Sequence, residues 1–194
     1  MRNTLIFAGI ALLLLLGGCN SYNTMVKSKI GVDAAWANVE SAYQRRSDLI
    51  NNLVQVVKGA ADFEKQTLVD VVNARASATQ VKIDPSNITP EKLAEFEKAQ
   101  SQMSSTLSRL LVVSENYPQL QATQQFRDLS FEVAGTENRI KVERDRYTEI
   151  VKNYNSDISV MPRSILAKMF GFAEKPFFKA DEGTQKAPTI NFGK

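Results

Sequence analysis

Apolar residues in the first half of the chain recur at steps of three and four, the spacing that puts side chains on one face of an α-helix. Residues 20–84 contain no proline, so no helix-breaking residue interrupts this stripe. We expect one long helix over residues 22–78, with Gly31 and Gly59 as the points where it can bend. The stripe comprises Trp36, Val39, Tyr43, Ile50, Leu53, Val57, Ala60, Val71, Ala74 and Ala78.

Two more long helices are predicted downstream. Thr89-Pro90-Glu91 is typical of a helix start, because threonine caps an N-terminus well, proline suits the first helical position and an acid is favourable in the first turn. This helix should extend to about Ser114, and the third should run over residues 120–158. Between them, Pro118 either reverses the chain or only kinks it.

The C-terminal part predicts a short amphipathic helix over residues 163–170, closed by Gly171. We expect it to cap the end of the bundle, and the alternative is that it lies on an anionic membrane surface. The aromatic residues of Pro176-Phe177-Phe178 should pack, and the residues after about Ala180 should be mobile. Alternating strand patterns and hairpin turns are missing, so the predicted fold class is all-α: an elongated antiparallel bundle of three long helices plus a short C-terminal helix.

The amino-acid composition excludes several kinds of catalytic and metal site. The chain has 194 residues, of which 43% are apolar and 23% charged, and it contains no histidine and one cysteine. These counts rule out a Ser-His-Asp triad, a Cys–His pair, histidine-ligated zinc or haem, and an internal disulfide. The formal net charge is +3, and the charges are interspersed instead of clustered, which is not a nucleic-acid-binding pattern. We expect no cofactor and no nucleic-acid partner.

The N-terminus has the features of an export signal. Arg2 precedes residues 5–18, which are uncharged and fewer than the about 20 apolar residues that span a bilayer. They lead into Leu16-Gly17-Gly18-Cys19, which resembles a bacterial lipobox and contains the only cysteine. We predict that residues 1–18 are a lipoprotein signal peptide that is cleaved, and that Cys19 is lipidated. An uncleaved N-terminal membrane segment is the alternative.

Both alternatives give the same orientation. Arg2 holds the N-terminus inside, so the rest of the chain is exported. We predict a place in the bacterial cell envelope, with the chain anchored in a membrane and the bundle on the non-cytoplasmic side, periplasmic or at the cell surface. Residues 19–180 would form the bundle domain, and residues 181–194 a flexible tail.

Five charged residues lie on or beside the predicted buried faces, where charged side chains are rare unless they are paired. The favoured interpretation is a set of structural ion pairs between helices. A di-metal site is the alternative, but such sites in bundles use histidine, which the chain lacks. Carboxylate acid–base catalysis would need a cleft, for which a thin bundle has little room. We therefore predict no catalytic, cofactor or metal residue. The five are Arg46, Glu64, Glu115, Glu137 and Arg144.

One of these residues gives a specific prediction. Arg46 lies on the apolar stripe of the first helix, 18 residues before Glu64, and is too far from it along a helix to pair with it. We expect Arg46 to lie within hydrogen-bond reach of a carboxylate from another helix.

Three blocks of sequence resemble the LemA family, in the order in which that family carries them. They cover nearly the whole exported part of the chain. One departure is Thr148, where many members carry asparagine. The blocks are Tyr22-Asn23, Trp36, Arg45-Arg46-Ser47-Asp48-Leu49-Ile50-Asn51-Asn52-Leu53-Val54, Glu64 and Ala74-Arg75; then Glu115-Asn116-Tyr117-Pro118-Gln119-Leu120, Phe126 and Leu129; then Gly135-Thr136-Glu137-Asn138-Arg139-Ile140, Arg144, Arg146-Tyr147 and Tyr154-Asn155, with Pro162, Ile165 and Ala167 as an ending.

This resemblance implies a membrane-anchored, exported or cell-surface helical bundle without an established enzymatic activity. Members are often encoded near membrane-associated proteases, which suggests partners of that kind. We expect a non-enzymatic scaffold or adaptor that holds envelope proteins through a helix face or through Phe177-Phe178, with dimerisation along an apolar flank left open. The alternative is a membrane-surface lipid-binding or remodelling bundle that acts through residues 163–170.

Overall fold

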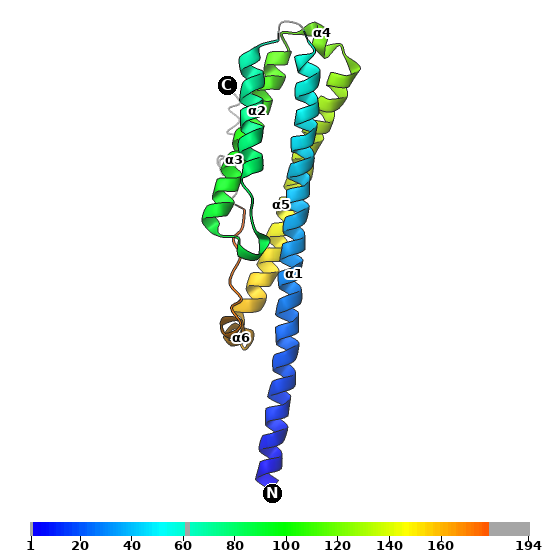
Figure 1. The fold of residues 1–194 in the computed structure, drawn as a ribbon. Coiled ribbons are helices and arrows are strands. Elements are labelled where there is room, and N and C mark those ends of the chain that lie inside the picture. Colours follow the sequence, from blue (N-terminus) through cyan, green and yellow to red (C-terminus); the bar gives the residue numbers. More distant parts are fainter. Residues whose placement is uncertain (1, 61–62, 179–194) are drawn as a thin grey trace, which may run out of the picture.

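The computed structural model describes residues 2–60 and 63–178, which form an elongated all-α bundle without strands (Figure 1). The predicted fold class is confirmed. Two long helices, α1 and α5, pack antiparallel, and shorter helices complete the bundle. The elements are α1 (Arg2–Lys58), α2 (Lys65–Gln80), the 3-10 turn η1 (Pro85–Asn87), α3 (Pro90–Ser114), α4 (Pro118–Gln121), α5 (Gln124–Ser159) and α6 (Arg163–Met169).

The single helix predicted over residues 22–78 is in fact two helices. α1 ends just before Gly59, and α2 runs back in the opposite direction (Figure 1). Gly31, the other expected bend, stays inside α1. The apolar pattern did not mark the reversal, because α1 and α2 both bury their stripes in the same cluster of side chains. A hydrophobic period shows which face of a helix is buried. The period is the same whether the chain continues straight on or turns back.

The bounds of α3 agree with the sequence prediction. Thr89 caps the helix by accepting a hydrogen bond at Oγ1 from the Lys92 amide, at 3.3 Å, and Pro90 occupies the first position. The chain reverses after α3 instead of kinking, because Pro118 begins the short corner helix α4. α5 consequently begins at Gln124, later than expected.

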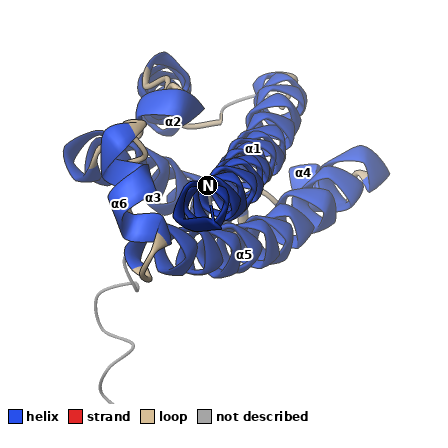
Figure 2. Ribbon diagram, turned by 90° about the horizontal axis from the view of Figure 1, so that it is seen from below, coloured by secondary structure: helices blue, strands red, loops and turns tan. Residues whose placement is uncertain are grey.

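The interior consists of two apolar clusters stacked along the length of the bundle. One lies toward the end that carries α6, which we call the base, and the other toward the end that carries α4, which we call the tip. The base-side cluster is centred on Trp36, whose ring centroid lies 5.4 Å from that of Phe96 and 5.6 Å from that of Tyr147. The tip-side cluster is mainly aliphatic and is contributed by α1, α2, α3 and α5. Seen end-on, α5 lies on one side of α1 and the α2–α3 hairpin on the other (Figure 2). α1, α3 and α5 each contribute residues to both clusters and so join the two parts of the core.

After α6 the chain returns along the bundle as an extended segment, residues 172–178, which we call the strap (Figure 1). Asn155 of α5 holds it by donating from Nδ2 to the Lys175 carbonyl at 2.8 Å and by accepting at Oδ1 from the Lys175 amide at 2.9 Å. Lys175 Nζ donates to the carbonyl oxygens of Pro85 and Ser86, at 3.0 and 2.8 Å. The strap thus ties α5 to η1.

The two aromatic residues expected to pack differ in outcome. The Phe178 ring stacks 5.9 Å from that of Trp36 and lies 5.3 Å from that of Tyr147. Phe177 is 45% exposed, so the prediction that it packs into the bundle is wrong. It lies in an extended segment, where neighbouring side chains point to opposite sides. The tail expected to be mobile, after Ala180, lies outside the described residues.

Candidate functional site

Arg46 is buried midway along the rod, between the two apolar clusters, with an exposed fraction of 1%. Its Nη1 donates to Glu137 Oε1 of α5 and to Ser104 Oγ of α3, each at 2.7 Å. Its Nη2 donates to Gln100 Oε1 of α3 at 2.6 Å. The predicted contact between Arg46 and a carboxylate of another helix is therefore present. One guanidinium links α1 to both α3 and α5 and fixes their relative register.

Arg144 forms a second interhelical pair. Its Nη2 lies 2.9 Å from Glu97 Oε1 of α3, and the two side chains are 21% and 18% exposed. The guanidinium carbon also lies 4.7 Å from the ring centroid of Phe178 in the strap. This combination of charge pairing and cation–π contact holds the end of the strap over the interface of α3 and α5.

Glu64 and Glu115, which were expected on buried faces, are exposed near the tip of the rod. No ion pair joins either of them to a basic side chain among the described residues. Glu64 precedes α2 and accepts a hydrogen bond from Thr67 Oγ1 at 2.9 Å, and Glu115 follows the last residue of α3. The expectation is wrong because the helical spacing does not continue through the two corners where the chain turns away from the core.

Gln100 and Lys175 are among the buried polar residues that sequence reasoning missed. Gln100 falls on the same three-and-four spacing as Phe96 and Met103, so the pattern could have identified it. Its Nε2 donates to the Ala78 carbonyl of α2 at 3.3 Å, which extends the Arg46 network to a fourth helix. Lys175 is 6% exposed in the strap, and burial lowers its pKa. No local pattern marks Lys175, because its partners are brought to it by the fold.

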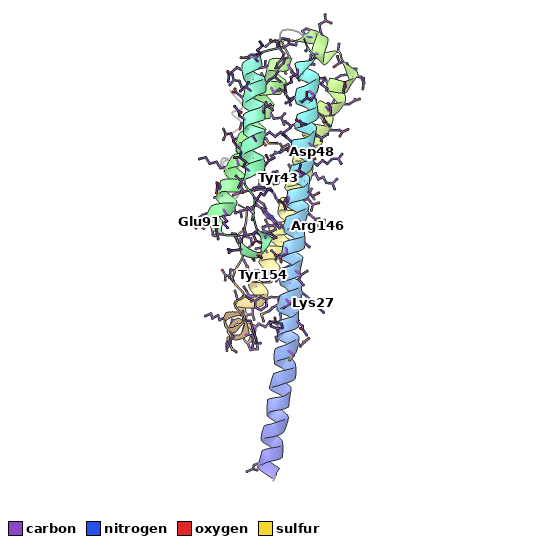
Figure 3. The ribbon with its side chains drawn as sticks, viewed as in Figure 1. Lys27, Tyr43, Asp48, Glu91, Arg146 and Tyr154 are labelled. Carbon is purple, nitrogen blue, oxygen red and sulfur yellow. The ribbon has the colours of Figure 1, made fainter. Side chains whose placement is uncertain are left out.

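Buried tyrosines line the base-side half of the core. Burial raises the pKa of Tyr43 above its ordinary value of 10, although the Arg144 and Arg46 charges work against the shift. Burial also raises the pKa of Tyr147, and the negative charge of Asp33 adds to that rise. Tyr43 lies midway along the bundle, and Tyr154, whose pKa is raised for the same reasons as that of Tyr147, lies nearer the base (Figure 3).

These shifts predict that the fold weakens in alkali. Above about pH 10 the unfolded chain releases tyrosine protons that the folded chain keeps, so the free energy of unfolding falls as the pH rises. Each of Tyr43 and Tyr147 contributes a slope of at most about 1.4 kcal/mol per pH unit in that window. Lys175 offsets part of this loss, because its pKa is lowered in the folded chain. The unfolded chain therefore keeps the lysine proton longer, and this group favours the folded state as the pH rises toward 10.5. Urea denaturation at neutral pH and at about pH 11 measures the effect, and Tyr147→Phe should make it smaller. Equal stability at both pH values would contradict the prediction.

The base of the rod brings Cys19 close to α6. Cys19 is exposed, and α1 runs through it without a break. One turn further along α1, the ring centroid of Tyr22 lies 4.9 Å from that of Phe170, which follows α6. α1 therefore contacts the base of the bundle within one turn of the cysteine. Among the described residues, no helix has an apolar stretch long enough to cross a membrane. Signal-peptide cleavage and lipidation stay predictions.

α6 has two different faces. Ala167 is buried, and Leu166 packs against the base-side cluster, so the expected capping of the bundle is observed. The other face is exposed and apolar: Ile165 is 53% and Met169 71% exposed. Phe170, just after the helix, is 55% exposed although its ring contacts that of Tyr22. α6 thus closes the core while presenting apolar side chains to the surroundings at the base.

At the opposite end, a groove of about 990 Å³ opens between the end of α1 and the corner made by α4, and we call it the tip groove. Leu120 is buried beneath it, and Val56, Ala60 and Tyr117 are half-buried around it. None of the described residues that line it is charged. Its exposed rim carries five carboxamide side chains, those of Asn52, Gln55, Asn116, Gln119 and Gln125.

Comparison with known proteins gives one family. A model of the LemA family matches residues 35–192 of the chain. Magnetosome protein MamQ 2 of Paramagnetospirillum magneticum is 26% identical over 175 residues, which cover 81% of this chain and 64% of the relative. Protein LemA of Metamycoplasma hominis is 22% identical over 160 residues, covering 82% and 69%. The chain therefore spans about 64% of the length of the MamQ relative.

Proposed function

The chain belongs to the LemA family, and from this premise we propose that it is a membrane-anchored scaffold or adaptor of the bacterial cell envelope. It acts by holding partner proteins at a fixed height from a membrane and carries out no chemical turnover. Its partners are envelope proteins, membrane proteases among them. Cys19 is the point of lipid attachment, and the bundle lies on the non-cytoplasmic side.

The single observation that supports this proposal best is the continuity of α1. The helix runs without a break from the exposed Cys19 to Met25, where the buried face of the bundle begins. An anchor at Cys19 would therefore be joined to the rod by helix instead of by a flexible linker. A stiff connection of this kind sets the distance and direction of a bound partner relative to the membrane.

The proposal is tested in cells with Cys19→Ser. We expect the natural chain to incorporate labelled palmitate and to sediment with membranes, and the variant to take up no label. Cross-linking followed by mass spectrometry then identifies the proteins held by the natural chain, with Cys19→Ser as the control. The lipoprotein assignment fails if the natural chain takes up no palmitate and the variant stays with the membrane. The scaffold assignment fails if no envelope protein is cross-linked.

A second candidate function is favoured by the exposed apolar face at the base. Ile165, Met169 and Phe170 lie beside the exposed Lys168, and apolar side chains next to a basic one are typical of a helix that rests on an anionic bilayer. In this alternative the bundle binds or remodels lipid through α6. A chain that starts at Asn20 keeps every buried core residue and is suitable for liposome flotation. Strong flotation that is lost in Met169→Glu supports the alternative, and no flotation supports the scaffold.

A further inference from the structure

We propose that the side of α5 that faces away from the bundle binds the same side of a second copy of the chain, with the two helices antiparallel. This side, which we call the outer face, carries four exposed residues at steps of four, three and four, the spacing of a seam between two packed helices. The four are Phe131, Gly135, Asn138 and Val142. The residues that α5 buries lie on its opposite side, and no described element covers the outer face (Figure 2).

The outer face begins and ends with apolar side chains that the bundle leaves in solvent. Phe131 is 76% and Val142 59% exposed, and they lie eleven residues, about three helical turns, apart. A second helix would remove both side chains from water, and burial of this kind drives most protein association. The outer face lies in the half of α5 nearer the tip, and charged side chains of both signs flank it. A lipid surface is therefore disfavoured as its occupant.

Gly135 indicates a close neighbour that the single chain does not supply. It lies within the 36-residue helix α5, where glycine is less stable than alanine. A Cβ at this position would meet nothing within 4 Å, so the fold of one chain does not require glycine there. Glycine lets another helix approach closely. In an antiparallel pair with Gly135 of one copy opposite Asn138 of the other, the asparagine side chain fills this space. The same register sets Phe131 against Val142.

The charges beside the outer face favour the antiparallel arrangement. In this register, acidic side chains of one copy come next to arginines of the other, and each contact occurs twice by symmetry. The contacts are Asp128 with Arg146, Glu132 with Arg139, and Asp145 with Arg127. An in-register parallel pair would keep the attraction between Arg127 and Glu132. It would also set Lys141 against Arg146, which is repulsive.

Two of these charged side chains have contacts within the chain that leave them able to reach a second copy. Glu132 lies 3.8 Å from Arg45, and Arg146 lies 3.6 Å from Glu143. The Glu132 side chain is 53% exposed and that of Arg146 is 60% exposed. Exposed pairs at such distances are weak, so exchanging them for contacts across the dimer costs little.

The outer face is small, so the dimer that it forms is weak. A contact over three turns of one helix falls at the lower end of the range of interface areas, below about 1,200 Å² in total. We expect a dissociation constant of about 10–100 µM.

An antiparallel dimer also limits where pairing can occur. α1 and α5 of each copy run along the rod, so the Cys19 residues of the two copies lie at opposite ends of the dimer. If Cys19 is anchored as proposed above, copies standing upright on two facing surfaces can pair, and neighbours on one surface cannot. The association itself goes beyond the scaffold function and does not depend on the anchor.

Self-association is measured on the purified full chain in a mild detergent, by sedimentation equilibrium from about 1 to about 300 µM. The test variant is Val142→Glu. The matched control is Val112→Glu on α3, because this valine is 63% exposed and lies outside the outer face. Circular dichroism verifies that both variants are folded. We expect Val142→Glu to raise the dissociation constant at least about tenfold, and Val112→Glu to leave it unchanged. A natural chain that stays monomeric, or equal effects of the two variants, would overturn the proposal.

The orientation is tested by chemical cross-linking of full chains that carry Cys19→Ser. Gln124→Cys and Glu149→Cys are made separately, because these exposed positions lie on the same side of α5 as the outer face and beyond its two ends. They face each other only in an antiparallel pair. A short bismaleimide should therefore join the two variants when they are mixed, and should not join either variant to itself. Cross-linking of each variant to itself would show a parallel pair and contradict the proposal.

Discussion

Replacing Glu137 with alanine is expected to lower the free energy of unfolding by about 3 kcal/mol, although its side chain is 46% exposed. The reason lies in its partner, because the Arg46 side chain is only 1% exposed. Without the carboxylate, a buried guanidinium that stays charged at all ordinary pH values keeps only neutral acceptors, from Ser104 and Gln100. The cost is that of a buried charge deprived of its counter-charge.

A neighbouring pair provides the matched control. Arg45 and Glu132 join the same two helices at 3.8 Å, and their side chains are 61% and 53% exposed. The two glutamates are thus similarly exposed, while the two arginines are not. Glu132→Ala should cost less than about 1 kcal/mol, because both charges are solvated without each other. Urea denaturation followed by far-ultraviolet circular dichroism measures both values, and equal losses would show that Arg46 is not the cause.

A double variant separates buried charge from lost contact. Arg46→Met fills much of the same space with an apolar side chain, so adding it to Glu137→Ala removes the unpaired charge. The double variant should be more stable than Glu137→Ala alone. If the two substitutions instead destabilise additively, the contribution of Glu137 is a local contact of α5 and not compensation of Arg46.

The sequence predicted the elements that depend on local chemistry. α3 begins at Pro90 because Thr89 caps it and proline fits the first position, and these causes are visible within a few residues of sequence. At Gly59 the sequence predicts only a bend, whereas helix α1 ends at Lys58 and the chain reverses. A glycine permits a reversal as readily as a bend, and what selects the reversal is the packing of α2 against α3, a contact between helices that the pattern within each helix does not show.

The candidate site residues likewise divide into those that the local sequence marks and those that only the packing of the helices brings together. Arg46 was predictable, because a charge on an apolar stripe must find a partner, but the choice of Glu137 over other carboxylates required the packing of α1 on α5. The tip groove left no signal in the periodicity. Its lining comes from α1, from the turn before α4 and from the start of α5, and carboxamides at surface positions look like ordinary solvated residues in sequence. Only their convergence around Leu120 distinguishes them.

Replacing Trp36 with alanine is expected to lower the free energy of unfolding by about 4 kcal/mol, the largest loss predicted for a single side chain. Trp36 is 1% exposed, and its ring contacts those of Phe96, Tyr147 and Phe178, which belong to α3, α5 and the strap. Removing it opens a cavity where four segments meet. Rigid helices cannot all move in to fill it, so the cost includes the cavity as well as the lost transfer energy.

The conservative substitution Trp36→Phe distinguishes packing from hydrogen bonding. The indole Nε1 is buried and has no acceptor among the described residues, so replacing the indole with a phenyl ring removes an unsatisfied donor together with some packing. We expect Trp36→Phe to cost no more than about 1.5 kcal/mol. Urea denaturation of both variants, followed by far-ultraviolet circular dichroism, gives the two values. If Trp36→Phe costs as much as Trp36→Ala, the indole has a specific partner and ring packing is not what makes Trp36 important. If both cost little, the base-side cluster does not depend on this side chain, and the strap and α3 are held by their polar contacts instead.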